Sequence, residues 1–168
     1  WTRVKGVYPA PPKAKQARVE LHLQWAPGGK AYWSAPAFVE TTAPDSRKVR
    51  LATVHYKPSG KSVRQNCEEF APLLADAAAK QADLVVMGET IPTAGVAGQP
   101  HELAEPIPGP STDYFRGLAK QHKLHLVFSL YERDGRAVYN TAVLIDPQGQ
   151  LVGKYRKVCP PHGEVEKG

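Results

Sequence analysis

The chain has 168 residues, of which 42% are hydrophobic and 23% are charged, values typical of a globular protein with room for one ordinary domain. No apolar run approaches the ~18–20 residues of a membrane-spanning helix, so no membrane segment is expected. The formal net charge is +6, but residues 1–48 carry +5 of it, and the basic side chains there are scattered. Because no basic helix or basic–aromatic cluster occurs, nucleic acid is not an expected partner.

Cysteine and histidine usage excludes two further classes. Cys67 and Cys159 are the two cysteines, and six histidines are dispersed, without the spacing of a disulfide framework or a metal site. We therefore expect no bound metal ion. The sequence starts at Trp1 without an initiator methionine and stops at Gly168, and we interpret it as a fragment of a longer protein.

The first segment, residues 1–45, is predicted to contain two β-strands. Between residues 17 and 25, apolar and polar side chains alternate, which is typical of a half-buried strand. A turn rich in proline and glycine follows, and residues 31–40 form a return strand in which Pro36 favours an edge position. Two strands cannot bury a core alone, so we expect them to be the C-terminal strands of a separate β-sandwich. Over this short stretch they resemble the closing strands of a jelly-roll carbohydrate-binding module.

After a turn-rich linker at 41–48, the pattern changes from residue 49 onwards to alternating strands and helices. The second domain is predicted to span residues 46–168. Ser62 and Gln65 have the spacing of a capping box, so a helix is expected to begin at Ser62, and Pro72 is expected to kink it. The other expected elements are strands at 49–55 and 84–87, a long loop at 91–110, a helix at 112–123, and strands at 124–132, 138–146 and 151–156.

Two charged residues stand where catalytic groups are often found. Glu89 directly follows the buried strand at 84–87, and partial burial there would raise its pKa towards the working pH of a general base. Lys157 closes a basic stretch after the last strand and could meet Glu89 across a cleft. Taken alone, Glu89 could be a structural acid that accepts loop N–H bonds, and Lys157 could be one more solvated charge.

Four motifs in sequence order favour the catalytic interpretation. The motifs are Ala82-Asp83-Leu84-Val85-Val86-Met87-Gly88-Glu89, Gly117-Leu118-Ala119-Lys120, Tyr139-Asn140-Thr141-Ala142-Val143-Leu144-Ile145-Asp146, and Gly149-Gln150-Leu151-Val152-Gly153-Lys154-Tyr155-Arg156-Lys157. Together they resemble the nitrilase, or carbon–nitrogen hydrolase, superfamily, although that family usually has proline where this chain has Gly88. The resemblance implies an α/β fold, namely the first half of a layered α-β-β-α sandwich.

The resemblance also implies residue roles. Glu89 would be the general base, Lys157 would stabilise the oxyanion, and Glu166 would position the substrate, with Glu164 as the alternative. The family's nucleophile is a cysteine on a later strand, which would lie beyond Gly168. The implied reaction is hydrolysis of an amide, nitrile or N-carbamoyl carbon–nitrogen bond through a thioester, with no cofactor. The fragment alone would then be inactive, and a homodimer of the whole protein is a further expectation.

The remaining candidates have weaker signals. Cys159 lies two residues after Lys157 and is an unfavoured candidate nucleophile, while Cys67 lies on an apolar helical face and is expected in the core. The rival function is binding of a carbohydrate by the aromatic side chains Trp25, Tyr32 and Trp33, with a hydrolase-like scaffold that has lost catalysis.

Overall fold

A computed structural model of the chain describes residues 3–23, 27–43 and 45–159. Its contacts divide the chain into two units, Trp1–Arg47 and Lys48–Gly168. In the first unit, none of the described residues forms a helix or a strand, so the strands expected at 17–25 and 31–40 are not confirmed. Leu21, Trp33 and Phe38 in these segments are exposed.

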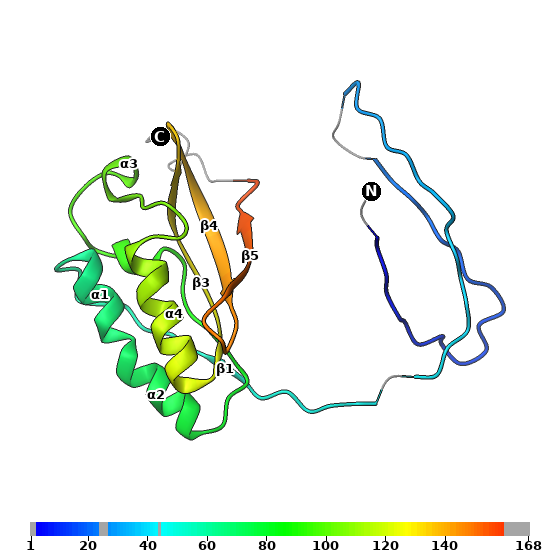
Figure 1. Ribbon diagram of the computed structural model, residues 1–168, viewed down its shortest axis with the longest axis horizontal. Helices are drawn as coiled ribbons and strands as arrows, with labels where there is room; N and C mark the ends of the chain where they lie inside the picture. Colours follow the sequence, from blue (N-terminus) through cyan, green and yellow to red (C-terminus); the bar gives the residue numbers. More distant parts are fainter. Residues whose placement is uncertain (1–2, 24–26, 44, 160–168) are drawn as a thin grey trace. The chain divides into compact units, whose positions relative to one another are not determined.

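The second unit is built on a five-stranded sheet with the spatial order β1-β2-β3-β4-β5 (Figure 1). The first three strands are parallel, and β3, β4 and β5 form an antiparallel meander. The strands are β1 (Leu51–Thr53), β2 (Leu84–Val86), β3 (His125–Asp134), β4 (Ala137–Ile145) and β5 (Leu151–Arg156). The meander matches the three antiparallel strands predicted from the sequence to within a few residues.

Helices cover one face of this sheet, with α1, α2 and α4 gathered on the same side (Figure 1). The helices are α1 (Val63–Glu69), α2 (Ala71–Ala79), the short 3-10 helix η1 (Ile91–Thr93), α3 (Pro100–Leu103) and α4 (Pro110–His122). The loop predicted at 91–110 therefore contains two short helical turns. One helical layer on one sheet is the predicted first half of the layered sandwich.

The start of α1 follows the sequence prediction, because the Ser62 hydroxyl caps it by accepting the backbone N–H of Gln65. Pro72 does more than kink the helix. The helix ends at Glu69, and α2 starts at Ala71 with the proline in its first turn, where the missing N–H has no helical partner to lose.

The core lies between the helices and the sheet and is centred on three phenylalanines. Phe70 and Phe115 have their ring centroids 6.2 Å apart, and Phe115 and Phe128 have theirs 4.4 Å apart. All three are at most 1% exposed. Cys67 lies in the same cluster at 1% exposure, which confirms the prediction that it packs in the core.

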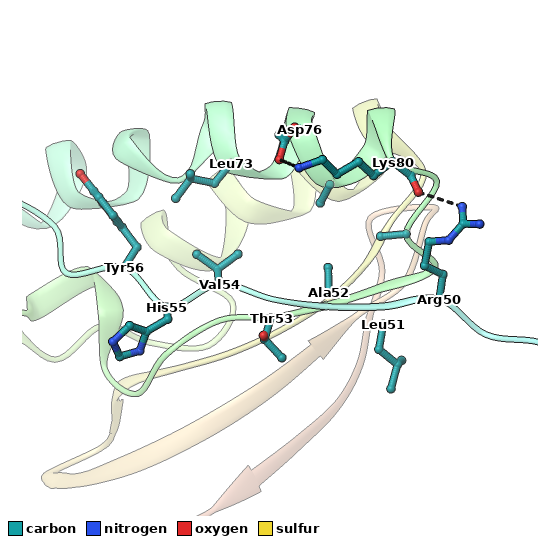
Figure 2. Close-up of a pocket in the computed structure, with 12 residues that line it drawn as sticks. Arg50, Leu51, Ala52, Thr53, Val54, His55, Tyr56, Leu73, Asp76 and Lys80 are labelled. Carbon is teal, nitrogen blue, oxygen red and sulfur yellow. Dashed lines mark hydrogen bonds and ion pairs between the residues drawn. The ribbon is translucent and has the colours of Figure 1, made fainter.

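At the β1 edge of the sheet, an open groove runs between β1 and α2 (Figure 2). Val54 and Ala52 point from β1 towards α2, whereas Leu51 and Thr53 point to the opposite side of the strand. The groove is lined by residues 50–56 and by the α2 side, and it contains none of the predicted catalytic residues. Leu51 and Val86 are exposed, so the face of the sheet away from the helices is open to solvent in the described part of the chain.

Truncation of the central ring should test this core. We expect Phe115→Ala to lower the free energy of unfolding by about 3–5 kcal/mol, because it removes a fully buried aromatic side chain and leaves a cavity. Urea denaturation followed by circular dichroism measures the change. Val152→Ala, at a 54% exposed position on β5, is the control and should change stability by less than about 0.5 kcal/mol. Equal effects of the two substitutions would contradict this assignment of the core.

Candidate active site

The turn after β2 fixes the position of Glu89. The backbone N–H of Met87 still donates to Val127 on β3, so the ladder continues past the assigned end of β2. Ser129 then holds both neighbours of Glu89: its N–H donates to the Gly88 carbonyl, and its hydroxyl accepts the Thr90 N–H at 2.7 Å. Thr90 takes a left-handed conformation with φ of 46°, which is uncommon for a residue other than glycine. The chain therefore turns sharply here and presents Glu89 at the end of the strand.

Lys157 directly follows β5, the strand at the opposite edge of the sheet from β1. Its backbone N–H donates to the Asn140 carbonyl on β4 at 2.9 Å, so the strand pairing extends to this residue. Its Nζ donates to Oε1 of Glu89 at 2.9 Å, although the two residues are 68 positions apart in the sequence. The Asn140 side-chain amide donates to the same oxygen at 2.6 Å. The structure thus brings together the acid and the amine singled out in the sequence.

The electrostatics at Glu89 differ from the prediction. We expected burial to raise its pKa, but the side chain is 60% exposed, so little desolvation opposes its charge. The hydrogen bonds from Lys157 and Asn140 instead lower the pKa below its ordinary value, because both donors favour the ionised form. The carboxylate is therefore held ionised in this chain, next to a cation that is 33% exposed.

Removal of the ammonium should reverse this shift. We expect Lys157→Met to raise the pKa of Glu89 towards its ordinary value, since the largest cause of the lowering is lost. Titration of the Glu89 side-chain carboxyl by ¹³C NMR measures it. Lys80→Met, which removes an exposed lysine paired with Asp76 on α2, is the control and should leave Glu89 unchanged. An unaltered Glu89 titration in Lys157→Met would show that the contact does not form in solution.

Glu166 and its alternative Glu164 lie outside the described residues, and their role stays a prediction. Cys159 is exposed. Cys67 donates to the Ser111 hydroxyl at 3.5 Å, and burial raises the pKa of its thiol to about 11. A buried thiol with a raised pKa is a poor nucleophile, because the thiolate is the reactive form.

Sequence reasoning missed a second carboxylate, Glu132 on β3. Its side chain is only 2% exposed, and it lies on the core-facing side of the strand in line with Phe128 and Leu130. Arg156 and Lys154 on β5 both bond it. The signal was available, because an acid that continues the alternating apolar pattern of a strand points into the protein and requires a partner.

Glu132 should make stability depend on acid pH. Hydrogen bonds lower the pKa of Glu132 from 4.5 to about 2. The bonds from Arg156 are the main cause, and those from Lys154 and Thr141 contribute less. A carboxyl whose pKa is lower in the folded state stabilises the fold above its unfolded value, and that contribution is lost as pH falls from about 4.5 to about 2. We expect Glu132→Gln to be less stable than wild type at pH 6, by on the order of 2 kcal/mol, and the gap to narrow by pH 3.

Urea denaturation of both proteins at the two pH values measures this gap. Glu68→Gln, which removes an exposed carboxylate paired with Arg64, is the control, and its stability should follow that of the wild type closely at both values. A gap between wild type and Glu132→Gln that stays constant with pH would contradict the ionised, paired state of Glu132.

Two searches of the described part of the chain give negative results. No group of three or more histidine, cysteine, aspartate or glutamate side chains in residues 3–23, 27–43 and 45–159 is arranged to hold a metal ion. No helix in the same ranges has the length and apolar character needed to cross a membrane.

The family profile for carbon-nitrogen hydrolases matches residues 48–167, which is more than half of the chain. The chain therefore belongs to the carbon-nitrogen hydrolase family, and its fold is that of the nitrilase superfamily. This assignment covers the whole second unit and agrees with the resemblance seen in the sequence.

Individual relatives are amide-hydrolysing proteins by name. A formamidase from Bacillus cereus (strain B4264) is 52% identical over 56 residues, covering 32% of this chain and 17% of the relative. An amidase from Nesterenkonia sp. superposes with a TM-score of 0.60 at 21% identity, over 71% of this chain and 46% of that one. A variant of the Nesterenkonia sp. AN1 amidase in complex with butyramide gives 0.58 at 20% identity, over 70% and 46%.

A carbon-nitrogen hydrolase from Helicobacter pylori G27 gives a TM-score of 0.58 at 26% identity, over 71% of this chain and 42% of that one. The chain thus spans less than half the length of these solved relatives, and its alignment with the formamidase is shorter still.

Proposed function

We propose that this chain supplies the base and the oxyanion-stabilising cation of an amide-hydrolysing site, with Glu89 as general base and Lys157 as the cation. The observation that carries the proposal is the 2.9 Å contact between Lys157 Nζ and Glu89 Oε1, formed between the ends of β2 and β5. An ion pair whose carboxylate is 60% exposed contributes little to the stability of the fold. A role in chemistry explains its position better than a role in folding.

The nucleophile in this proposal is a cysteine outside residues 1–168. Support comes from Cys67, which is buried, has a raised pKa and donates to Ser111, so it is a poor nucleophile. Further support comes from the extent of the match, because the chain covers less than half of the solved relatives. Residues 1–168 alone are then inactive towards amides.

The reaction follows from the residue types. Glu89, held ionised at neutral pH, accepts the proton of the incoming thiol, and the thiolate attacks the carbonyl carbon of the amide. Negative charge develops on the carbonyl oxygen, where the Lys157 ammonium stabilises it more than it stabilises the neutral substrate. Glu89 returns the proton to the leaving amine, and water then cleaves the thioester.

The proposed substrate class is a short aliphatic amide. The formamidase name of the Bacillus cereus relative and the butyramide complex of the Nesterenkonia amidase variant both favour small amides. In the same proposal Glu166 positions the substrate. Three earlier predictions stay predictions: the domain division into residues 1–45 and 46–168, a homodimer of the whole protein, and carbohydrate binding, for which Tyr32 and Trp33 are exposed and Trp25 lies outside the described residues.

Ammonia release from formamide and butyramide tests the function. We expect the chain expressed with its natural downstream sequence to release ammonia, and residues 1–168 alone to release none. Glu89→Gln and Lys157→Met in the longer protein should each lower kcat/KM by about 10²–10⁴-fold, because each removes a group that acts in the transition state.

The matched controls are Glu68→Gln and Lys80→Met, which remove an exposed acid and an exposed lysine from helical ion pairs. Both should keep activity within a factor of two. A folded Glu89→Gln variant with full activity, or a longer protein that carries no cysteine after Gly168, would exclude this mechanism.

A further inference from the structure

The end of β5 places consecutive side chains on opposite faces of the sheet. Arg156 contacts Glu132 on the helix-covered face, whereas Lys157 contacts Glu89. The neighbouring strand repeats the pattern, since the Thr141 hydroxyl donates to Glu132 and the Asn140 amide donates to Glu89. Neighbouring residues on β4 and β5 therefore contact the buried carboxylate on one face of the sheet and the exposed carboxylate on the other, because side chains alternate between the faces along each strand.

Both oxygens of Glu132 are fully used. Oε1 accepts from Lys154 Nζ and from Arg156 Nη2, the latter at 2.9 Å. Oε2 accepts from Arg156 Nε at 2.9 Å and from the Thr141 hydroxyl at 2.7 Å. The Arg156 fork is therefore bidentate, which fixes its orientation as well as its distance. A carboxylate that is 2% exposed requires this degree of pairing, because an unpaired buried charge is strongly destabilising.

Arg156 also contacts two residues other than Glu132. Its guanidinium lies over the Tyr139 ring, 3.9 Å from the centroid, and donates to Asp134 at 2.6 Å. Arg156 is also the last residue of β5, an outer strand whose only partner strand among the described residues is β4. The position of the next residue, Lys157, therefore depends on how firmly the end of this outer strand is held.

We propose that Glu132 is a positioning residue for the candidate active site. By binding Arg156 on the helix-covered face of the sheet, it fixes the end of β5 and so keeps Lys157 in contact with Glu89 on the other face. The inference deepens the proposed function and rests on it, since it concerns the same ammonium. Glu132 lies on the opposite face from Glu89 and acts through β5.

The sign of one measurement separates this role from a direct electrostatic effect. Loss of the negative charge of Glu132 leaves Lys154 and Arg156 uncompensated, and through space this lowers the pKa of Glu89 further. Loss of the Lys157 contact raises the pKa of Glu89, because the ammonium is the main cause of its lowering. A rise therefore requires displacement of a donor to Glu89, of which Lys157 has the larger effect on the pKa and Asn140 the smaller, and a through-space effect cannot produce it.

The experiment is ¹³C NMR titration of the Glu89 carboxyl in the full 168-residue chain, without substrate. We expect Glu132→Gln to raise the pKa of Glu89 by at least half of the rise produced by Lys157→Met. Asp134→Asn is the matched control, because it removes the exposed carboxylate partner of Arg156 and leaves the buried one. It should leave the pKa of Glu89 unchanged or slightly lower.

An unchanged or lowered pKa of Glu89 in folded Glu132→Gln would overturn the proposal, and so would a rise of equal size in Asp134→Asn. If Glu132→Gln does not fold, Arg156→Lys decides the question, since it keeps the charge but loses the bidentate fork. A rise in the pKa of Glu89 that is smaller than the rise in Lys157→Met supports the positioning role of Glu132. An unchanged pKa of Glu89 in Arg156→Lys refutes it. The pKa of Glu89 is measured without turnover, so a failure of the proposed catalytic function would leave this result intact. Likewise, an unchanged pKa of Glu89 in Glu132→Gln would leave the proposed catalytic function untouched.

Discussion

The register of the β3-β4-β5 meander is the constraint on which the site depends. Thr141 pairs with Arg156 and Tyr139 with Glu132, which brings Glu132 and Arg156 together on the covered face, while Lys157 contacts Glu89. A slip of one residue in β5 would exchange the faces of all its side chains. Lys157 would then point towards the helices, and Arg156 would point to the open side. Register therefore determines the geometry of the candidate site as well as that of the sheet.

The carboxylates of Glu132 and Glu89 have similar partners but differ in their solvent exposure. Glu132 and Glu89 each accept hydrogen bonds from cationic side chains, and the pKa of each is lowered as a result. At 2% exposure, Glu132 is desolvated and depends on its partners, so it contributes to the geometry of the fold. At 60% exposure, Glu89 keeps much of its hydration and depends less on its partners than Glu132 does.

The sequence predicted the parts of the fold that local patterns govern. Alternating apolar residues and the turn at Asp134-Gly135 placed the meander, and Ser62 placed the start of α1. It could not predict that Phe70 would separate two helices, since Pro72 is compatible with either a kink or a new first turn. Nor could it give the donors that Lys157 and Asn140 supply to Glu89 or the exposure of that carboxylate, and the pKa prediction failed for these reasons. The strands expected at 17–25 and 31–40 relied on partners that the pattern itself did not supply.

Solvent exposure links the geometry of the site to the proposed reaction. In this chain the Glu89–Lys157 pair is hydrated, and a hydrated ion pair is weak because water screens both charges. Any protein surface that covers the open face would remove that water, strengthen the attraction and raise the intrinsic proton affinity of Glu89. The two effects on the pKa of Glu89 oppose each other, because desolvation favours the neutral acid and the stronger attraction to the ammonium favours the carboxylate. The half-sheet described here fixes where the two groups stand, and the surface that covers it would determine how strongly they act.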